Sequence, residues 1–359
     1  MSLQFRKYQG LGNDFILMDG RRGELPDFSG EPARQLCDRR FGIGGDGLIL
    51  ALPPQADGDV RMQILNADGS EAEMCGNGIR CFARFLADLD QSPVGTSWRV
   101  ETPAGMIIPE LLGDEQVTVD MGTPFLDPAT VPSTIAAGSP LAEAELEVAG
   151  DPLMVAAVGM GNPHAVVQVQ DLEALDFDRL GPALEQHPAF PARTNVHFVS
   201  VQAPDRLTVR VWERGAGPTL ACGTGACATL VATHLRGACE RRATVELPGG
   251  PLEIHWDEQD HLQMAGPAVF VFSGTVPAAA NQPGSSDATA SSPNVAAASS
   301  NASIDCATAC AEGCQRPDDC PSAAARAQAL ALLDQVSLDE LVNLANASVE
   351  ERTRRRIGF

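Results

Sequence analysis

The stretch EMCGNGIRC, residues 73–81, places a cysteine directly before the glycines that open a helical pattern. A helix usually begins after Ser, Thr, Asp or Asn, and glycine lowers helix stability, so a thiol followed by glycines is an unusual beginning. From Ile79 onward the apolar residues recur at i, i+3, i+4 and i+7, which predicts an amphipathic helix. The stretch ACGTGACA, residues 221–228, repeats the arrangement before an apolar run that suits a buried helix.

The two cysteines, Cys75 and Cys222, belong to an internal repeat. CGNG recurs as CGTG 147 residues later. A polar residue that ends a strand candidate stands nine positions before each cysteine, Asn66 in the first copy and Glu213 in the second. Nearer the amino terminus, GLGN recurs as GMGN at an offset of 149 residues. Three landmarks at nearly the same offset indicate two copies of one α/β domain, each with one cysteine.

A cysteine at a helix N-terminus has chemistry that an ordinary core cysteine lacks. The unpaired N–H groups and the helix dipole stabilise negative charge and can lower the pKa of the thiol, and the glycines let a carboxylate approach the backbone. If the two domains face each other across a cleft, one thiolate can remove a proton from a carbon atom while the opposite thiol returns one, which inverts its configuration. The repeat therefore predicts a two-base racemase or epimerase whose site closes over its substrate.

Composition restricts the class of protein. The net charge of −22 argues against a nucleic-acid or anionic-membrane partner, and no stretch is apolar and long enough to span a bilayer. The amino terminus lacks the apolar segment of a secretory signal, so we expect a cytoplasmic protein. The single lysine, Lys7, has no phosphate-binding loop around it. This argues against a pyridoxal-phosphate enzyme, and we expect no cofactor.

The chain divides by composition into a globular part, a linker and an extension. We expect an α/β fold with an N-terminal domain at 1–120, completed by a strand at 264–272, and a C-terminal domain at 121–263. Residues 273–303 are rich in Ala, Ser, Pro and Asn, which predicts a disordered linker. Residues 304–359 contain apolar stripes at helical spacing, which predict a small helical extension.

Five motifs in the globular part resemble those of the diaminopimelate epimerase family. They are KYQGLGNDFILMD, NADGSEAEMCGNGIRCFARF, GMGNPHAVV, TNVHFV and ERGAGPTLACGTGACA, in this order, and the resemblance extends from residue 3 to about residue 272. It implies a cofactor-independent isomerase that interconverts LL- and meso-2,6-diaminopimelate for lysine and peptidoglycan synthesis. It also implies two pseudo-symmetric domains, each a mostly antiparallel sheet around a central helix, with the active site in the cleft between them. We further expect a homodimer.

The resemblance assigns roles to individual residues. Cys75 and Cys222 are implied as the catalytic acid/base pair, and His164 and Glu213 as important for catalysis. Arg214 suits a bidentate pair with the distal carboxylate of the substrate, and Glu213 suits an ammonium group. The residues implied to bind substrate are Asn13, Asn66, Gly76, Asn77, Asn162, Asn195, Glu213, Arg214, Gly223 and Thr224.

Two other interpretations remain open. A proline or hydroxyproline racemase would use the same two thiols, but its substrates have no second amino-acid end for Glu213 and Arg214 to bind. A thiol-redox or metal-binding protein would use its cysteines for electrons or ions, and opposed thiols within bonding distance can oxidise to a disulfide. The remaining cysteines of the globular part fit small buried side chains instead; these are Cys37, Cys81, Cys227 and Cys239.

The extension contains four more cysteines, Cys306, Cys310, Cys314 and Cys320, spaced C-x3-C-x3-C-x5-C. The first two gaps lie within the range of metal ligands, but the pattern has no specific mechanism attached to it. Metal binding, disulfides and incidental thiols all remain possible there, and the extension is a candidate for docking a protein partner. In the epimerase-like part we expect no metal site.

Overall fold

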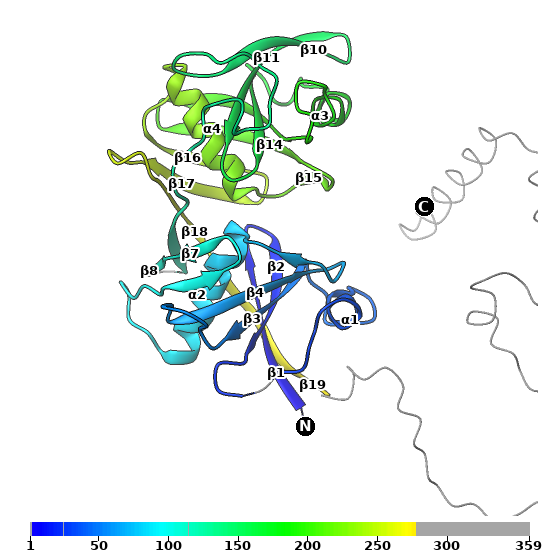
Figure 1. The fold of residues 1–359 in the computed structure, drawn as a ribbon, viewed down its shortest axis with the longest axis vertical. Helices are drawn as coiled ribbons and strands as arrows, with labels where there is room; N and C mark the ends of the chain where they lie inside the picture. Colours follow the sequence, from blue (N-terminus) through cyan, green and yellow to red (C-terminus); the bar gives the residue numbers. More distant parts are fainter. Residues whose placement is uncertain (1, 24, 114, 278–359) are drawn as a thin grey trace, which may run out of the picture. The chain divides into compact units, whose positions relative to one another are not determined.

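The computed structural model describes residues 2–23, 25–113 and 115–277, which form the two sheet-rich halves drawn in colour in Figure 1. Each half contains one long helix, α2 (Gly76–Asp90) in the first and α4 (Gly223–Leu235) in the second. The expected linker beyond residue 277 and the expected extension at 304–359, with its cysteines, lie outside the described residues.

Two β-sheets contain the described strands. The first has eight strands, paired in the order β19 (Val269–Pro277), β1 (Ser2–Gly10), β2 (Asn13–Asp19), β3 (Gly47–Leu52), β4 (Val60–Asn66), β6 (Val100–Thr102) and β7 (Gly105–Ile107), with β5 (Glu71–Ala72) beside β4. The second has eleven, in the order β10 (Glu143–Val148), β11 (Asp151–Gly159), β12 (Pro163–Gln168), β13 (Asn195–Ala203), β14 (Arg206–Glu213), β16 (Arg242–Leu247), β17 (Gly250–Trp256), β18 (Leu262–Pro267), β9 (Gln116–Asp120) and β8 (Pro109–Gly113), with β15 (Gly217–Thr219) beside β14.

The two sheets repeat one topology. In the first sheet β2 is parallel to β3 and β4 is parallel to β6, and in the second the equivalent pairs β12–β13 and β14–β16 are parallel. The other described strand pairs are antiparallel. In each half a short strand, β5 or β15, precedes the long helix. The predicted fold, two related α/β domains with mostly antiparallel sheets, is confirmed.

Each sheet is covered by helix on both faces. Phe15 and Leu17 of β2 pack toward α2, whereas the alternate residues Ile16 and Met18 pack toward α1 (Glu31–Cys37). The second sheet is arranged in the same way, with α4 in one core cluster and α3 (Phe177–Glu185) in the other. Successive side chains of a strand point to opposite faces, so a strand covered on both sides is apolar at consecutive positions. This explains continuous apolar runs such as FILM and LILAL.

The long helices are enclosed as the sequence predicted. The apolar stripe of α2, which is Ile79, Phe82, Ala83 and Leu86, is completely buried. In α4 every residue from 225 to 233 is buried, so this helix has no solvent-facing side along that stretch. The cysteines predicted as core residues, Cys37, Cys81, Cys227 and Cys239, are also buried. None of the helices in the described ranges is long and apolar enough to cross a membrane.

Two predicted boundaries differ from the strands that form. β8 and β9 lie within the predicted N-terminal domain, yet β9 pairs with β18 and so extends the second sheet. Their apolar side chains still enter the core around α2, so this hairpin joins the two halves. The predicted strand at 264–272 is instead the end of β18 and the beginning of β19, which belong to different sheets.

The linker predicted from residue 273 also begins too early. β19 continues to Pro277, because residues 273–277 pair with residues 2–6 of β1. The sequence SGTVP has little apolar character, but the main-chain hydrogen bonds of a strand do not depend on side-chain type. Composition alone therefore missed the last part of this strand.

We expect β19 to decide whether a shortened chain folds. A chain that ends at Ala268 loses this strand and the aromatic contacts Tyr8–Phe270 and Phe5–Phe272, with ring centroids 5.5 Å and 5.8 Å apart. A chain that ends at Pro277 keeps every described strand. Circular dichroism melting should therefore show a lowered melting temperature only for the shorter chain. Equal melting temperatures for the two truncations would contradict this account of β19.

Candidate active site

The two cysteines occupy equivalent positions at the starts of the two long helices. Cys75 is the N-cap of α2 and Cys222 the N-cap of α4, and both have extended backbone, with φ and ψ of −141° and 120° for Cys75 and −130° and 108° for Cys222. The Cys75 sulfur accepts a hydrogen bond from the Gly78 backbone N–H at 3.4 Å. The thiol thus takes the place of the usual Ser or Asp cap.

The two helix starts approach each other closely. A Cβ built on Gly76 would lie 3.8 Å from Gly223 Cα, and a Cβ on Gly223 would lie equally far from Gly76 Cα. The same Cβ atoms would lie 3.1 Å and 2.9 Å from the Met264 side chain of β18. Larger side chains would therefore press against Met264, so glycine at both positions lets the helix N-termini, with their unpaired N–H groups, face one region.

Asn77 connects the two halves beside Cys75. Its amide nitrogen donates to Asn13 Oδ1 at 3.3 Å and to the Ala221 carbonyl at 3.4 Å, immediately before Cys222. The Cys75 thiol donates to the same Asn13 oxygen at 3.7 Å. Of the predicted site residues, Asn13, Cys75 and Asn77 therefore form one hydrogen-bonded group that reaches the second helix start.

Arg80 holds this group in place from the buried side of α2. Its guanidinium donates to Asn77 Oδ1 at 2.9 Å and to the Gly76 carbonyl at 3.0 Å. The side chain is completely buried, and burial lowers the pKa of its guanidinium. Its hydrogen-bond acceptors among the described residues are neutral. Arg80 therefore places an unpaired positive charge behind the start of α2.

The second half contributes a histidine pair. His164 Nε2 lies 2.7 Å from Asn162 Oδ1, and His164 Nδ1 lies 2.8 Å from His197 Nε2. Both rings are completely buried, and desolvation lowers both pKa values, that of His197 to about 3. Both imidazoles are therefore neutral near pH 7. One nitrogen of each ring and the Cys222 sulfur lie within 4.8 Å of one another.

Glu213 is the last residue of β14 and Arg214 follows it, and the described residues show no ion pair between the two. Glu213 Oε1 accepts a hydrogen bond from the Thr219 hydroxyl at 2.6 Å, and the Arg214 guanidinium donates to the Ala192 carbonyl at 3.1 Å. Asn195 Oδ1 accepts from the Arg214 backbone N–H at 3.0 Å, which fixes the turn after the strand. Asn162 and Arg214 line a pocket of about 350 Å³.

Asn66 and Thr224 complete the predicted set. Asn66 is paired with Gly47 in the first sheet, at the edge where Asn13 begins β2, and its amide donates to Ser70 at 3.0 Å. The described side-chain hydrogen bond of Asn66 stays within its own turn, so it does not join Asn66 to the thiols. The Thr224 hydroxyl lies 3.6 Å from the Cys222 sulfur.

The pKa of both thiols is raised, not lowered. A helix N-terminus can lower the pKa of a thiol, and backbone N–H groups do act in that direction, from Gly78 on Cys75 and from Gly225 on Cys222. Burial has the larger effect and raises the pKa of both thiols, and the negative charge of Glu213 raises both further. Because its charge acts on both sulfurs, the Glu213 carboxylate lies close enough to influence the two thiols together.

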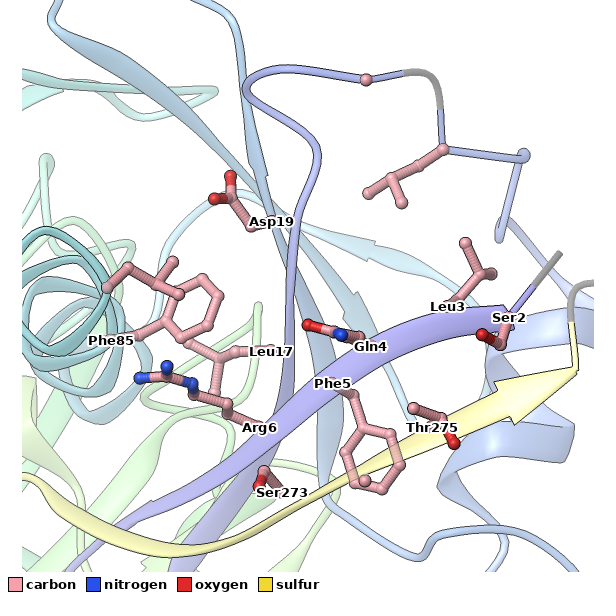
Figure 2. A pocket seen from close by; sticks show the side chains of 14 residues that line it. Ser2, Leu3, Gln4, Phe5, Arg6, Leu17, Asp19, Phe85, Ser273 and Thr275 are labelled. Atoms are coloured by element: carbon pink, nitrogen blue, oxygen red, sulfur yellow. The ribbon is translucent and has the colours of Figure 1, made fainter.

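A different hollow, of about 640 Å³, lies along β1 and β19 (Figure 2). Figure 2 shows Arg6 and Leu17 near Phe85 of α2 on one side and Phe5 near Thr275 of β19 on the other. Its lining contains neither a cysteine nor any of the predicted site residues. The arrangement of thiols, amides and helix starts therefore marks the candidate active site.

Comparison with known proteins shows the family of the chain. The sequence profile of the family described as diaminopimelate epimerase matches residues 5–126 and 156–271. A diaminopimelate epimerase of Prochlorococcus marinus is 58% identical over 280 residues, covering 76% of this chain and 92% of that protein. One from Synechococcus elongatus is 56% identical over 281 residues, covering 78% of this chain and 100% of that protein. The chain belongs to the diaminopimelate epimerase family.

Solved structures with a similar fold have diverged much further in sequence. A PhzF-family phenazine biosynthesis protein of Bacillus anthracis matches with a TM-score of 0.57 at 16% identity, covering 77% of this chain and 99% of that one. A hydroxyproline epimerase of Agrobacterium vitis, with bound trans-4-hydroxy-L-proline, matches with a TM-score of 0.55 at 17% identity. The match covers 77% of this chain and 92% of that one. At this identity the likeness shows a shared fold with the diaminopimelate epimerase family.

Three residues that the fold brings to the site were not predicted from the sequence. His197 lies in the motif TNVHFV, which we used only for Asn195, and Arg80 lies in the stretch that first drew attention to Cys75. Asp46 accepts a hydrogen bond from the Asn13 amide at 2.7 Å. The internal repeat does not mark His197, because the counterpart of His197 in β3 is the apolar residue Ile49.

Replacing Glu213 with Gln should lower the pKa of both Cys75 and Cys222. The substitution removes the negative charge that raises both values, so the thiolate form becomes easier to reach at either cysteine. The rate of iodoacetamide alkylation of each cysteine, followed by peptide mass spectrometry across pH, reports the two pKa values.

A matched control uses Glu240, whose charge raises the pKa of Cys239 alone among the described cysteines. Glu240→Gln should shift only the alkylation profile of Cys239. An unchanged profile at both Cys75 and Cys222 in Glu213→Gln would place Glu213 outside the site.

Proposed function

We propose that the chain interconverts LL- and meso-2,6-diaminopimelate without a cofactor, with Cys75 and Cys222 as the acid/base pair. The observation that carries this proposal is that two equivalent helices begin at these cysteines and that their starts meet at Gly76 and Gly223. Two bases on opposite sides of one carbon are what inversion by proton transfer requires. The product belongs to lysine and peptidoglycan synthesis.

The proposed reaction begins with one cysteine as thiolate and the other as thiol. The thiolate takes the α-proton of the substrate, and the opposite thiol donates its proton to the other face of the same carbon. The two cysteines thus exchange protonation states, and the free enzyme returns to its first form by exchanging protons with water. Burial raises the pKa of both sulfurs, which makes each thiolate a stronger base toward a carbon acid.

The helix starts supply the charge stabilisation that this reaction needs. Loss of the α-proton spreads negative charge onto the α-carboxylate, and the backbone N–H groups after Cys75 and Cys222 face the region where it would lie. Gly76, Asn77, Gly223 and Thr224 provide these groups. Donors already held in position stabilise charge without reorganising, which is the larger part of many enzymatic rate enhancements.

The surroundings of the thiols suit a substrate with two amino-acid ends. Arg214 and Asn162 line one pocket, where a guanidinium can hold a distal carboxylate and an amide can accept an ammonium N–H. Asn13, Asn66, Asn195 and Glu213 supply further polar groups, and neutral His164 orients Asn162. Proline has no distal carboxylate or amine to use this pocket, so we favour diaminopimelate over proline.

We also propose a cytoplasmic location, because a biosynthetic isomerase acts on a soluble metabolite, and a homodimer, as expected from the sequence. The mass of the single chain is 37.7 kDa, and analytical ultracentrifugation should give twice this mass. A single species at the chain mass would contradict the dimer but would leave the proposed reaction untouched.

The reaction is tested by proton NMR of LL-diaminopimelate with the reduced protein in D₂O. We expect loss of the α-proton signal and appearance of the meso isomer, and no change with proline or hydroxyproline. Cys75→Ala and Cys222→Ala should each lose at least about 100-fold in rate, because each removes one proton-transfer group. Cys227→Ala, a matched change in the buried part of α4, should keep its activity.

Two results would contradict the proposal. Exchange with proline but not with diaminopimelate would assign the site to the other substrate class. Full activity in either Cys75→Ala or Cys222→Ala would exclude the two-base assignment.

A further inference from the structure

We propose that Cys222, His164 and His197 form a site for a thiophilic divalent cation, with Zn²⁺ as the best fit, and that the bound ion blocks the enzyme reversibly. From the sequence we expected no metal site in this part of the chain. The binding itself is independent of the proposed function, and only the inhibition rests on it.

The ligand set is the first argument. One nitrogen of each imidazole and the Cys222 sulfur lie within 4.8 Å of one another, in a buried position. Zn²⁺ binds thiolate sulfur at about 2.3 Å and imidazole nitrogen at about 2.0–2.1 Å, so ligand atoms around one ion lie less than about 5 Å apart. Two imidazoles and one thiolate are a ligand set that Zn²⁺ accepts, with the fourth position left to water.

The hydrogen-bonding pattern of the histidines is the second argument. His164 Nε2 faces a carbonyl oxygen of Asn162, so it carries the proton, and His164 Nδ1 accepts from His197 Nε2–H. His197 Nδ1 then carries a lone pair, and it has no hydrogen-bond partner among the described residues. A buried acceptor without a partner is rare in folded proteins, and a metal ion would use it. The lone pair of His164 Nδ1 accepts from His197 Nε2–H, so His164 binds the ion by exchanging this hydrogen bond for the metal.

The fold holds His197 rigidly against the helix that carries Cys222. A Cβ on Gly225 would lie 2.0 Å from His197 Cε1 and 2.7 Å from either ring nitrogen. The ring therefore sits directly against the first turn of α4, three residues beyond Cys222. A ligand held by close packing needs little ordering when the ion binds, which favours binding.

Protonation and charge also suit a cation. Both imidazoles are neutral near pH 7 because burial lowers the pKa of each, so neither must lose a proton before it binds an ion. The thiol of Cys222 must release one proton to water for each ion that binds, so the affinity rises with pH. The ion and one thiolate leave one positive charge, and Glu213, whose charge acts on Cys222, lies near enough to balance it.

The bound ion would remove Cys222 from catalysis without touching Cys75. A thiolate that coordinates Zn²⁺ cannot donate or accept a proton, and the site would then lack one of its two acid/base groups. A chelator would restore activity, which distinguishes this state from a Cys75–Cys222 disulfide, since the disulfide needs a reductant.

The test uses Co²⁺ as a spectroscopic probe for the Zn²⁺ site. In the full chain with Cys306, Cys310, Cys314 and Cys320 replaced by Ser, Co²⁺ should give a thiolate-to-cobalt charge-transfer band that Zn²⁺ removes by competition. Cys222→Ala should abolish the band. Cys75→Ala is the matched control, because it removes the opposite thiol, and it should keep the band.

The histidines are tested by His164→Gln and His197→Gln, each checked for folding by circular dichroism. Each should weaken binding by more than the roughly 10–100-fold that loss of an outer hydrogen-bond partner costs a metal site. If His197→Gln does not fold, His164→Gln and Cys222→Ala decide the question.

Three outcomes would overturn the proposal. These are no charge-transfer band, a band that persists in Cys222→Ala, or a band lost equally in Cys75→Ala, which would mean an ion bridging the two thiols. None of these measurements uses substrate, so they stand whether or not the chain acts on diaminopimelate. Zn²⁺ inhibition of the active enzyme, reversed by a chelator, is then the expected functional consequence.

Discussion

The close approach of two helix N-termini is the constraint on which the rest of this structure depends. Gly76 and Gly223 meet over Met264, and any side chain at either position would press on that methionine. Because the helices meet at their starts, the capping residues of both helices and their free N–H groups reach one place. The duplicated sheets hold each helix in the same way, and the hairpin β8–β9 ties one half to the other.

Burial at this meeting point decides the electrostatics of the site. Cys222 is buried and Cys75 is half-buried, and the unfavourable cost of a thiolate in these positions outweighs the help from the helix N-termini. Arg80 supplies a buried positive charge behind α2, and Glu213 supplies a negative charge toward both sulfurs. A site with thiols that are hard to ionise is suited to removing a weakly acidic proton from carbon, provided that the substrate itself completes the charge balance.

The local features of this fold could be predicted from the sequence, whereas features that depend on distant contacts could not. The stripe from Ile79 predicted α2, and the repeated offset of Cys75 and Cys222 predicted the duplicated topology. The pairing of β9 with β18 and the last residues of β19 depend on partners far along the chain. The direction of the thiol pKa shifts could not be predicted for the same reason, because it depends on how far the folded chain buries each sulfur. His197 gave no local signal, since one histidine in a strand has the same pattern whether or not it faces a site.

The central claim is that two thiols act on opposite faces of one carbon, and the position of the first deuterium tests it most directly. LL-diaminopimelate is incubated with the enzyme in D₂O, and the early reaction mixture is separated into unreacted substrate and meso product. Two bases predict that the product carries deuterium at the inverted carbon while the remaining substrate keeps its proton, because each face is served by a different thiol. Equal early incorporation of deuterium into substrate and product would show a single base serving both faces and would contradict the account.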